Sequence, residues 1–143
     1  MTSTEHLLIE RARKLLRAVV RKGKQLTSPN DVRDFLLFTL ALRGNEVFGV
    51  VLLDNQNRGQ VWCELFYGSV NETHIYPREA VKLAPQYNAA AIILVHNHPS
   101  GSMEVNSSDR HIAKKLKQAL ELIDVRVLDH FIVAGDSSIS KAE

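Results

Sequence analysis

The sequence predicts a layered α/β fold, of the α+β kind, in which helices flank one mixed β-sheet. Two observations predict it. Short apolar runs of strand length alternate along the chain with longer stretches in which apolar residues recur every three or four positions, as they do on one face of a helix. The 143 residues, 45% of them hydrophobic and 24% charged, also suit one globular domain with its own core.

The N-terminal segment, residues 1–27, is predicted to be a basic amphipathic helix ahead of a domain at residues 28–143. Thr2 and Glu5 have the spacing of a capping box. The first 24 residues carry seven Lys and Arg against two acidic residues. We interpret this excess of positive charge as a solvated helix face. The alternative is weak, non-specific contact with nucleic acid.

A second helix is predicted to begin at Pro29, which suits the first helical position behind Ser28 as N-cap, and to close at Gly44. An unbroken apolar run at Val47–Leu53 is then typical of a buried strand. Turn-forming residues follow it, so a strand at Gln60–Tyr67 is expected to complete a hairpin. The apolar stripe of the helix is Val32, Phe35, Leu36 and Leu40.

In the second half of the chain, Pro77 can open a helix that runs towards Asn88, and Pro85 is expected to kink it or end it early. Ala89–Val95 is a fully apolar strand, and residues 96–106 are expected to form a loop. The next helix carries Ile112, Ala113, Leu116, Leu120 and Ile123 on one face, and the last strands are expected at Val125–Val133 and Ser137–Ser140.

Several classes of protein are disfavoured by composition. No apolar run approaches the roughly 20 residues of a membrane span, and the N-terminal residues lack the apolar core of a signal peptide. The single cysteine, Cys63, cannot form an internal disulfide. We therefore expect a cytoplasmic protein with no membrane partner.

The segment His96-Asn-His98-Pro-Ser-Gly carries the clearest chemical signal. Two histidines separated by one residue in an extended segment point the same way, so both imidazoles can reach one ion at about 2.0–2.1 Å. Asp109, at the start of the next helix, can supply a third ligand. Three protein ligands leave a fourth tetrahedral position for water, which is the catalytic arrangement of zinc.

These residues also have structural interpretations. Two histidines near the end of a strand can be ordinary polar residues. A carboxylate in the first turn of a helix is stabilised by the unpaired backbone N–H groups and the helix dipole. If Asn106 is the N-cap, Asp109 falls at the capping-box position.

The sequence resembles the JAMM motif of MPN-domain metalloproteases, and more closely the bacterial RadC family. The likeness covers roughly residues 30 to 143 and rests on short motifs that occur in order. They are EVFGV at 46–50, LFYGS at 65–69, YPRE at 76–79, NAAA at 88–91, HNHPSG at 96–101, Asp109 and LDHFIV at 128–133.

The resemblance implies an MPN (JAB) fold, a sandwich similar to that of cytidine deaminases. It also implies zinc as the cofactor, because His96, His98 and Asp109 match the family's metal ligands. Glu46 matches the glutamate that hydrogen-bonds the metal-bound water and acts as general base and then as acid. Without the resemblance, Glu46 would be one candidate base beside Glu64, Glu72 and Glu79.

One position departs from the family pattern. The family has a serine three residues before the aspartate, thought to donate a hydrogen bond to the developing oxyanion, and here that position is Asn106. An asparagine amide can also donate, and Ser107 is the alternative donor. Ligation of a metal is therefore a safer expectation than turnover.

The favoured interpretation is a zinc hydrolase of the JAMM type that cleaves an amide, peptide or isopeptide bond of a protein or peptide substrate. The main rival is a binding module in DNA repair or recombination with a structural or vestigial metal, and a third possibility is a metal-free MPN scaffold. A zinc nucleoside deaminase is excluded, because that site needs a Cys-x-x-Cys pair and the chain has only Cys63. His130 is expected to be a satisfied core histidine, and the alternative is a supporting position beside the metal ligands, because it follows Asp129 in a family-like string.

Overall fold

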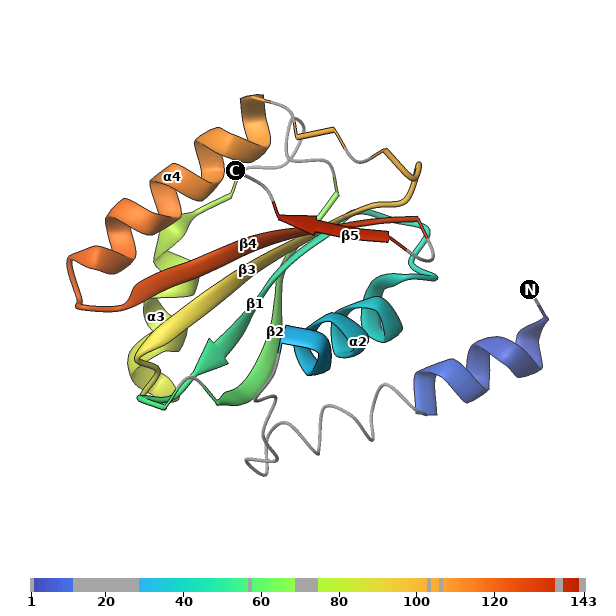
Figure 1. Ribbon diagram of the computed structural model, residues 1–143, viewed down its shortest axis with the longest axis horizontal. Helices are drawn as coiled ribbons and strands as arrows, with labels where there is room; N and C mark the ends of the chain where they lie inside the picture. The colour runs from blue at the N-terminus through green and yellow to red at the C-terminus, as the bar shows by residue number, and fades with distance from the viewer. Residues whose placement is uncertain are drawn as a thin grey trace.

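The computed structural model describes residues 2–11, 29–56, 58–68, 75–102, 104–105, 107–135 and 138–141. Five strands in this part of the chain form one mixed sheet in the order β2-β1-β3-β4-β5 (Figure 1). β1 is antiparallel to β2 and β3, β3 is parallel to β4, and β5 is antiparallel to β4. The strands are β1 Val47–Leu53, β2 Gly59–Tyr67, β3 Ala91–His98, β4 Arg126–Ala134 and β5 Ser138–Lys141. The predicted mixed sheet flanked by helices is thus confirmed.

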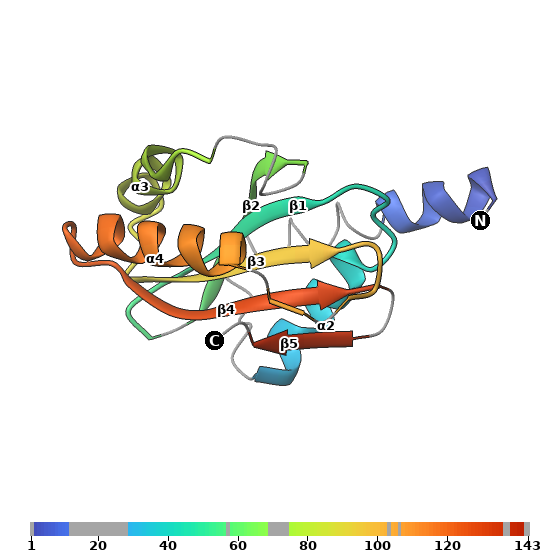
Figure 2. The same ribbon diagram turned by 90° about the horizontal axis from the view of Figure 1, so that it is seen from above.

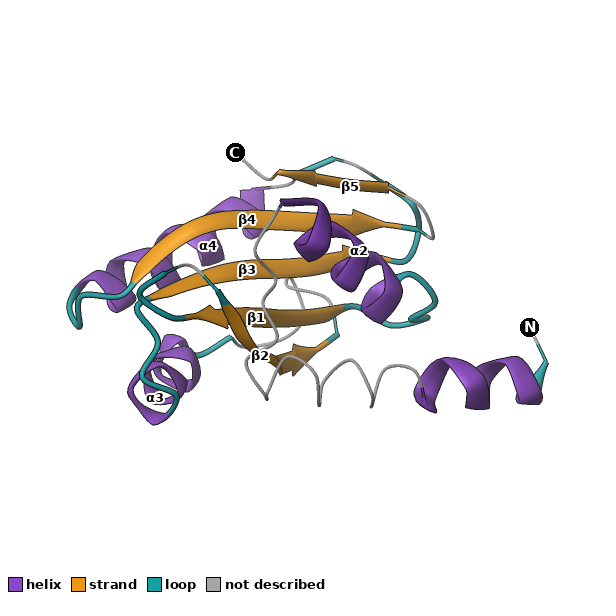
Figure 3. Cartoon of the chain, turned by 60° about the horizontal axis from the view of Figure 1, so that its bottom comes forward, coloured by secondary structure: helices purple, strands orange, loops and turns teal. Residues whose placement is uncertain are grey.

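The helices α2 (Pro29–Leu40), α3 (Pro77–Gln86) and α4 (Ser107–Glu121) cover the two faces of the sheet. α2 lies on one face, and α3 and α4 lie on the other (Figures 2 and 3). Alternation along β1 and β3 divides their buried side chains between the two layers. Every residue of β1 and β3 is consequently buried, as expected for central strands that are covered on both faces.

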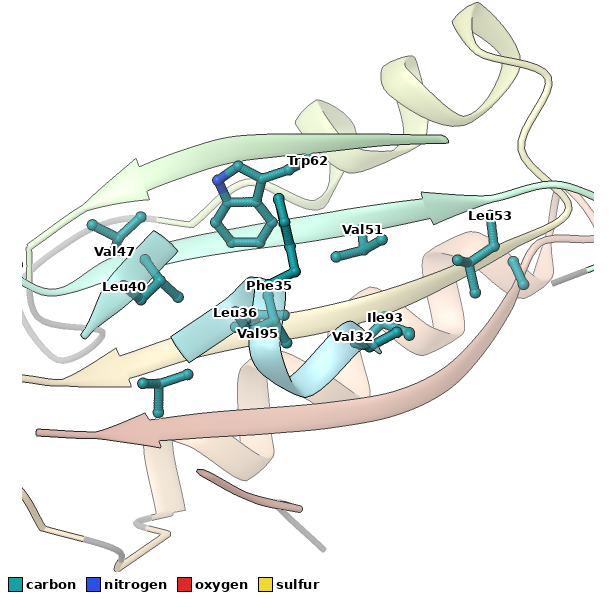
Figure 4. Close-up of a cluster of buried hydrophobic side chains, with 12 residues drawn as sticks. Val32, Phe35, Leu36, Leu40, Val47, Val51, Leu53, Trp62, Ile93 and Val95 are labelled. Carbon is teal, nitrogen blue, oxygen red and sulfur yellow. The ribbon is translucent and has the colours of Figure 1, made fainter. Parts of the chain in front are cut away.

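The core beneath α2 includes Trp62 of β2 (Figure 4). Its ring packs edge-to-face on Phe35 of α2, with ring centroids 6.4 Å apart, and it lies directly over Gly49 of β1. A Cβ atom at Gly49 would clash with the Trp62 ring and lie 2.8 Å from the carbonyl oxygen of Cys63. Glycine at this position therefore lets the tryptophan ring rest on the strand.

Most predicted boundaries agree with the structure, and four details were wrong. β3 begins two residues later than expected and includes His96–His98, which the sequence suggested were in a loop. Pairing with β4 extends the strand to His98, and His96 also pairs with Phe48 of β1. α2 ends at Leu40, ahead of Gly44. Ile123 lies beyond the end of α4 and is 40% exposed.

Two predictions drawn from local chemistry are confirmed. α3 ends at Gln86, one residue after Pro85, as expected because proline lacks a backbone donor. The N–H of Glu5 donates to the hydroxyl of Thr2 over 3.2 Å at the start of a helix at residues 3–11. The rest of the predicted first helix and the Ser28 cap lie outside the described residues. No helix in the described ranges is long and apolar enough to cross a membrane.

Candidate metal centre

The three residues predicted as metal ligands lie together where β3 ends and α4 begins. Alternation along β3 directs His96 and His98 to the same face of the sheet, the face that α4 covers. Asp109 is the third residue of α4. One potential ligand atom from each residue lies within 4.8 Å of the others, and all three residues are buried.

The carboxylate of Asp109 links the two imidazole rings. Its Oδ1 lies 3.1 Å from Nδ1 of His96, and its Oδ2 lies 3.5 Å from Nε2 of His98. The other nitrogen of His98, Nδ1, is 2.9 Å from the carbonyl oxygen of Ser102. Since a carbonyl only accepts, Nδ1 of His98 must donate, which leaves the Nε2 lone pair available to a metal.

The backbone of His98 is held by two glycines. Its carbonyl oxygen accepts hydrogen bonds from the N–H of Gly101 over 3.0 Å and of Gly135 over 3.1 Å. Gly101 has φ of +85° and Gly135 has φ of +64°, a region that favours glycine. The turn after β3 and the turn after β4 therefore both fix the position of the second histidine.

The donors present fit a zinc ion. Two neutral imidazoles and one carboxylate are ligand types that zinc prefers. Nε2 of His96 is buried and has no hydrogen-bond partner among the described residues, which is costly for a polar atom unless a ligand satisfies it. Ligand atoms on a tetrahedral ion at about 2.0–2.1 Å stand roughly 3.3 Å apart, close to the 3.5 Å between His98 Nε2 and Asp109 Oδ2.

Glu46, the predicted base, lies beside this cluster. It directly precedes β1, and its Oε2 is 3.4 Å from Nε2 of His96. Its side chain is 30% exposed, whereas that of His96 is 2% exposed. Glu46 is therefore the acidic group that both solvent and the cluster can reach.

The two rival glutamates in the described residues do not share this position. Glu64 is held by Arg43 in a 2.7 Å ion pair and accepts a hydrogen bond from Nε1 of Trp62. Glu79 lies on α3 and pairs with Lys82. Glu72 lies outside the described residues.

No contact of a described residue brings a predicted oxyanion donor to the cluster. Asn106 lies outside the described residues. Ser107 is the first residue of α4, and its side chain is exposed. The role of either residue therefore stays a prediction.

The expectation that His130 is a satisfied core histidine is confirmed for its burial and wrong for its hydrogen bonding. The residue is buried on β4, but its Nε2 has no hydrogen-bond partner in the described part of the chain. The ring of Phe48 lies near both His96 and His130, with centroids 5.8 Å and 6.0 Å away. Burial, reinforced by repulsion from His96, lowers the pKa of His130 to about 4.

Sequence reasoning also missed Asn97, between the two histidines. It is 1% exposed. Its side-chain oxygen accepts a hydrogen bond from the N–H of Val47, and its Nδ2 donates to the carbonyl of Asn45 over 3.0 Å. The available signal was an amide side chain directly after a strand predicted to be buried, since a buried amide needs partners for both its donor and its acceptor.

Comparison with known proteins gives one family and a set of close relatives. The sequence profile of the family described as RadC-like JAB domain matches residues 26–143. A UPF0758 protein of Tolumonas auensis is 46% identical over 136 residues, and one of Thiobacillus denitrificans is 48% identical over 136 residues. These matches cover 95% of this chain but 61% of each relative. The chain thus spans about six-tenths of the length of these relatives, and their names state no activity.

Proposed function

The chain belongs to the family of RadC-like JAB-domain proteins, and from that membership we propose that it is a zinc-dependent hydrolase of the JAMM type. The proposed substrate is an amide, peptide or isopeptide bond in a protein or peptide. The observation that carries the proposal is the buried cluster of His96, His98 and Asp109, with Glu46 beside it.

In this proposal His96, His98 and Asp109 would hold the metal with the two ring nitrogens and one carboxylate oxygen. When bound, zinc supplies a Lewis acid for the substrate carbonyl and activates a water at neutral pH. The carbonyl of Ser102 keeps the proton of His98 on Nδ1, so Nε2 is the nitrogen that would bind the ion. Asp109 would orient the His96 ring through Nδ1, and its other oxygen lies 3.5 Å from Nε2 of His98; the helix start stabilises its negative charge.

Glu46 would move the proton. Its Oε2 lies at the exposed side of the cluster, where it can accept a proton from the attacking water and return it to the leaving amine. Its neighbour His96 is buried, so the carboxylate and not the ring is open to the substrate. Asn106 and Ser107 remain the candidate donors to the oxyanion.

The proposal is tested by metal analysis and a cleavage screen on the same preparation. The purified chain should contain about one zinc per molecule and should cleave members of a peptide library or an isopeptide-linked pair. Removal of zinc by a chelator should stop cleavage, and added zinc should restore it. A preparation with a full complement of zinc and no cleavage of any amide, or cleavage that a chelator leaves unchanged, would overturn the proposed reaction.

A further inference from the structure

The side chain of Asn97 extends the pairing between β1 and β3. The backbone register of these two strands ends at Phe48 and His96. At the next position, the amide of Asn97 takes over from the backbone, since it accepts from the N–H of Val47 and donates to the carbonyl of Asn45. One side chain thereby provides both a donor and an acceptor, as a peptide group does.

These two contacts lie on either side of Glu46. Asn97 fixes the carbonyl of the residue before Glu46 and the N–H of the residue after it. The carbonyl of Glu46 itself accepts a 2.8 Å hydrogen bond from the N–H of Gly68, next to β2. The main chain that carries the proposed base is therefore held from both neighbouring strands.

We propose that Asn97 is a positioning residue that sets the distance between the Glu46 carboxylate and the metal ligands. Asn97 is covalently joined to His96 and His98, so its hydrogen bonds connect the backbone of the two ligands directly to the backbone of the base. Because successive side chains in a strand alternate, the histidines face α4 while Asn97 faces the other layer and does not compete for the metal. This inference rests on the proposed hydrolase function.

The side-chain type follows from the two contacts. An aspartate at position 97 can still accept from Val47 but cannot donate to Asn45, and an alanine can do neither. Asn97→Asp therefore removes one hydrogen bond from the segment around Glu46, and Asn97→Ala removes two. Thr39→Val is the matched control, because the Thr39 hydroxyl is also buried and donates to the carbonyl of Phe35, but within α2.

The first readout is hydrogen exchange of single backbone amides in the metal-free full chain. In Asn97→Ala, exchange at Val47 and Gly68 should accelerate about tenfold relative to Val50 in the middle of β1, as expected for the loss of a hydrogen bond. Gly68 is the informative amide, because it contacts Glu46 and not Asn97. In Asn97→Asp, the backbone amide of Val47 should exchange as slowly as in the wild type, whereas that of Gly68 should exchange faster. In Thr39→Val, the exchange rates of the Val47 and Gly68 amides relative to Val50 should stay at their wild-type values.

The second readout is the split between kcat and KM on a verified substrate. Asn97→Ala should lower kcat by about 10²-fold, the usual cost of a misplaced catalytic group, with KM and zinc content unchanged. Unchanged exchange ratios at Val47 and Gly68, or an unchanged kcat in a variant whose amides are loosened, would overturn the inference. Absence of zinc from the wild-type chain would instead overturn the proposed function, and the exchange ratios would still decide whether Asn97 holds Glu46.

Discussion

Oδ1 of Asp109 lies 3.1 Å from Nδ1 of His96, and both side chains are buried. The same carboxylate reaches His98 through its other oxygen, so one residue of α4 connects the two histidines of β3. All three residues supply a ligand atom to the proposed site, and Asp109 also orients the His96 ring, whereas the carbonyl of Ser102 orients His98.

Removal of a single ligand should therefore abolish stable metal binding. His98→Ala and Asp109→Asn should each reduce zinc content from about one per chain to near zero at stoichiometric metal, with a loss of at least 10–100-fold in affinity. Elemental analysis and competition with a chromogenic chelator measure both quantities. Zinc content that stays at the wild-type level in His98→Ala would remove His98 from the ligand set.

Glu46→Gln should separate proton transfer from metal binding. The amide is nearly isosteric and Glu46 is not a proposed ligand, so zinc content and thermal stability should stay at wild-type values. Hydrolysis should fall by about 10²–10⁴-fold, the usual contribution of general acid–base catalysis. A wild-type rate would contradict the assigned role, and loss of zinc would show that Glu46 is itself a ligand.

The stability of the metal-free protein should decline in acid because of His130. Its pKa falls from 6.5 to about 4 on folding, so below pH 6.5 the unfolded chain binds a proton that the folded chain does not. The contribution is fully present above pH 6.5, is lost as the pH falls towards 4, and amounts to about 3 kcal/mol at most. In denaturant unfolding experiments between pH 7 and pH 4, the free energy of unfolding of His130→Leu should fall less with pH than that of the wild type. His111→Gln, a change at an exposed histidine, should keep the wild-type slope.

Gly49→Ala should destabilise the fold. The new methyl group would collide with the Trp62 ring and crowd the carbonyl of Cys63, a case of overpacking that costs about 1–3 kcal/mol or more. Gly44→Ala is the matched control, because a Cβ there meets no atom within 4 Å. Equal midpoints of urea unfolding for the two variants would contradict the packing described for Trp62.

Binding to DNA should be weak and non-specific if it occurs through the basic N-terminal segment. Affinity that depends on phosphate contacts falls steeply as salt rises. Replacement of Arg13, Lys14, Arg17 and Arg21 by glutamine should remove such binding, as measured by fluorescence anisotropy at several salt concentrations. Tight, sequence-selective binding at physiological salt would favour a repair or recombination module over a hydrolase.

The sequence predicted those strand and helix boundaries that depend only on neighbouring residues. β1 was predicted with the bounds that the structure gives, since an unbroken apolar run between polar segments has one interpretation. Pro29 and Pro85 marked a helix start and a helix end for similar reasons. The end of β3 was missed, because it depends on pairing with β1 and β4, which are distant in sequence.

In the candidate site, too, features set by local spacing were predicted and features set by the pairing of distant strands were not. The His-x-His spacing was enough to predict that both rings point the same way, although these residues were expected to lie in a loop after the strand. The spacing could not distinguish Glu46 from Glu64, because the register between β1 and β3 brings residues 46 and 96 together. Asn97 was missed for the same reason, since its partners lie about fifty residues earlier in the chain.

The hairpin turn between β1 and β2 lies at the opposite end of β1 from Glu46. There, Asp54 accepts hydrogen bonds from the N–H groups of Gln56 and Arg58 and closes the turn with its own side chain. Residues added at this turn lengthen the loop and leave the register of the paired strands unchanged. One residue added within β1 would instead turn every later side chain of the strand to the opposite face of the sheet. The turn is consequently the place to insert an epitope or a fluorescent label, and the strand is not.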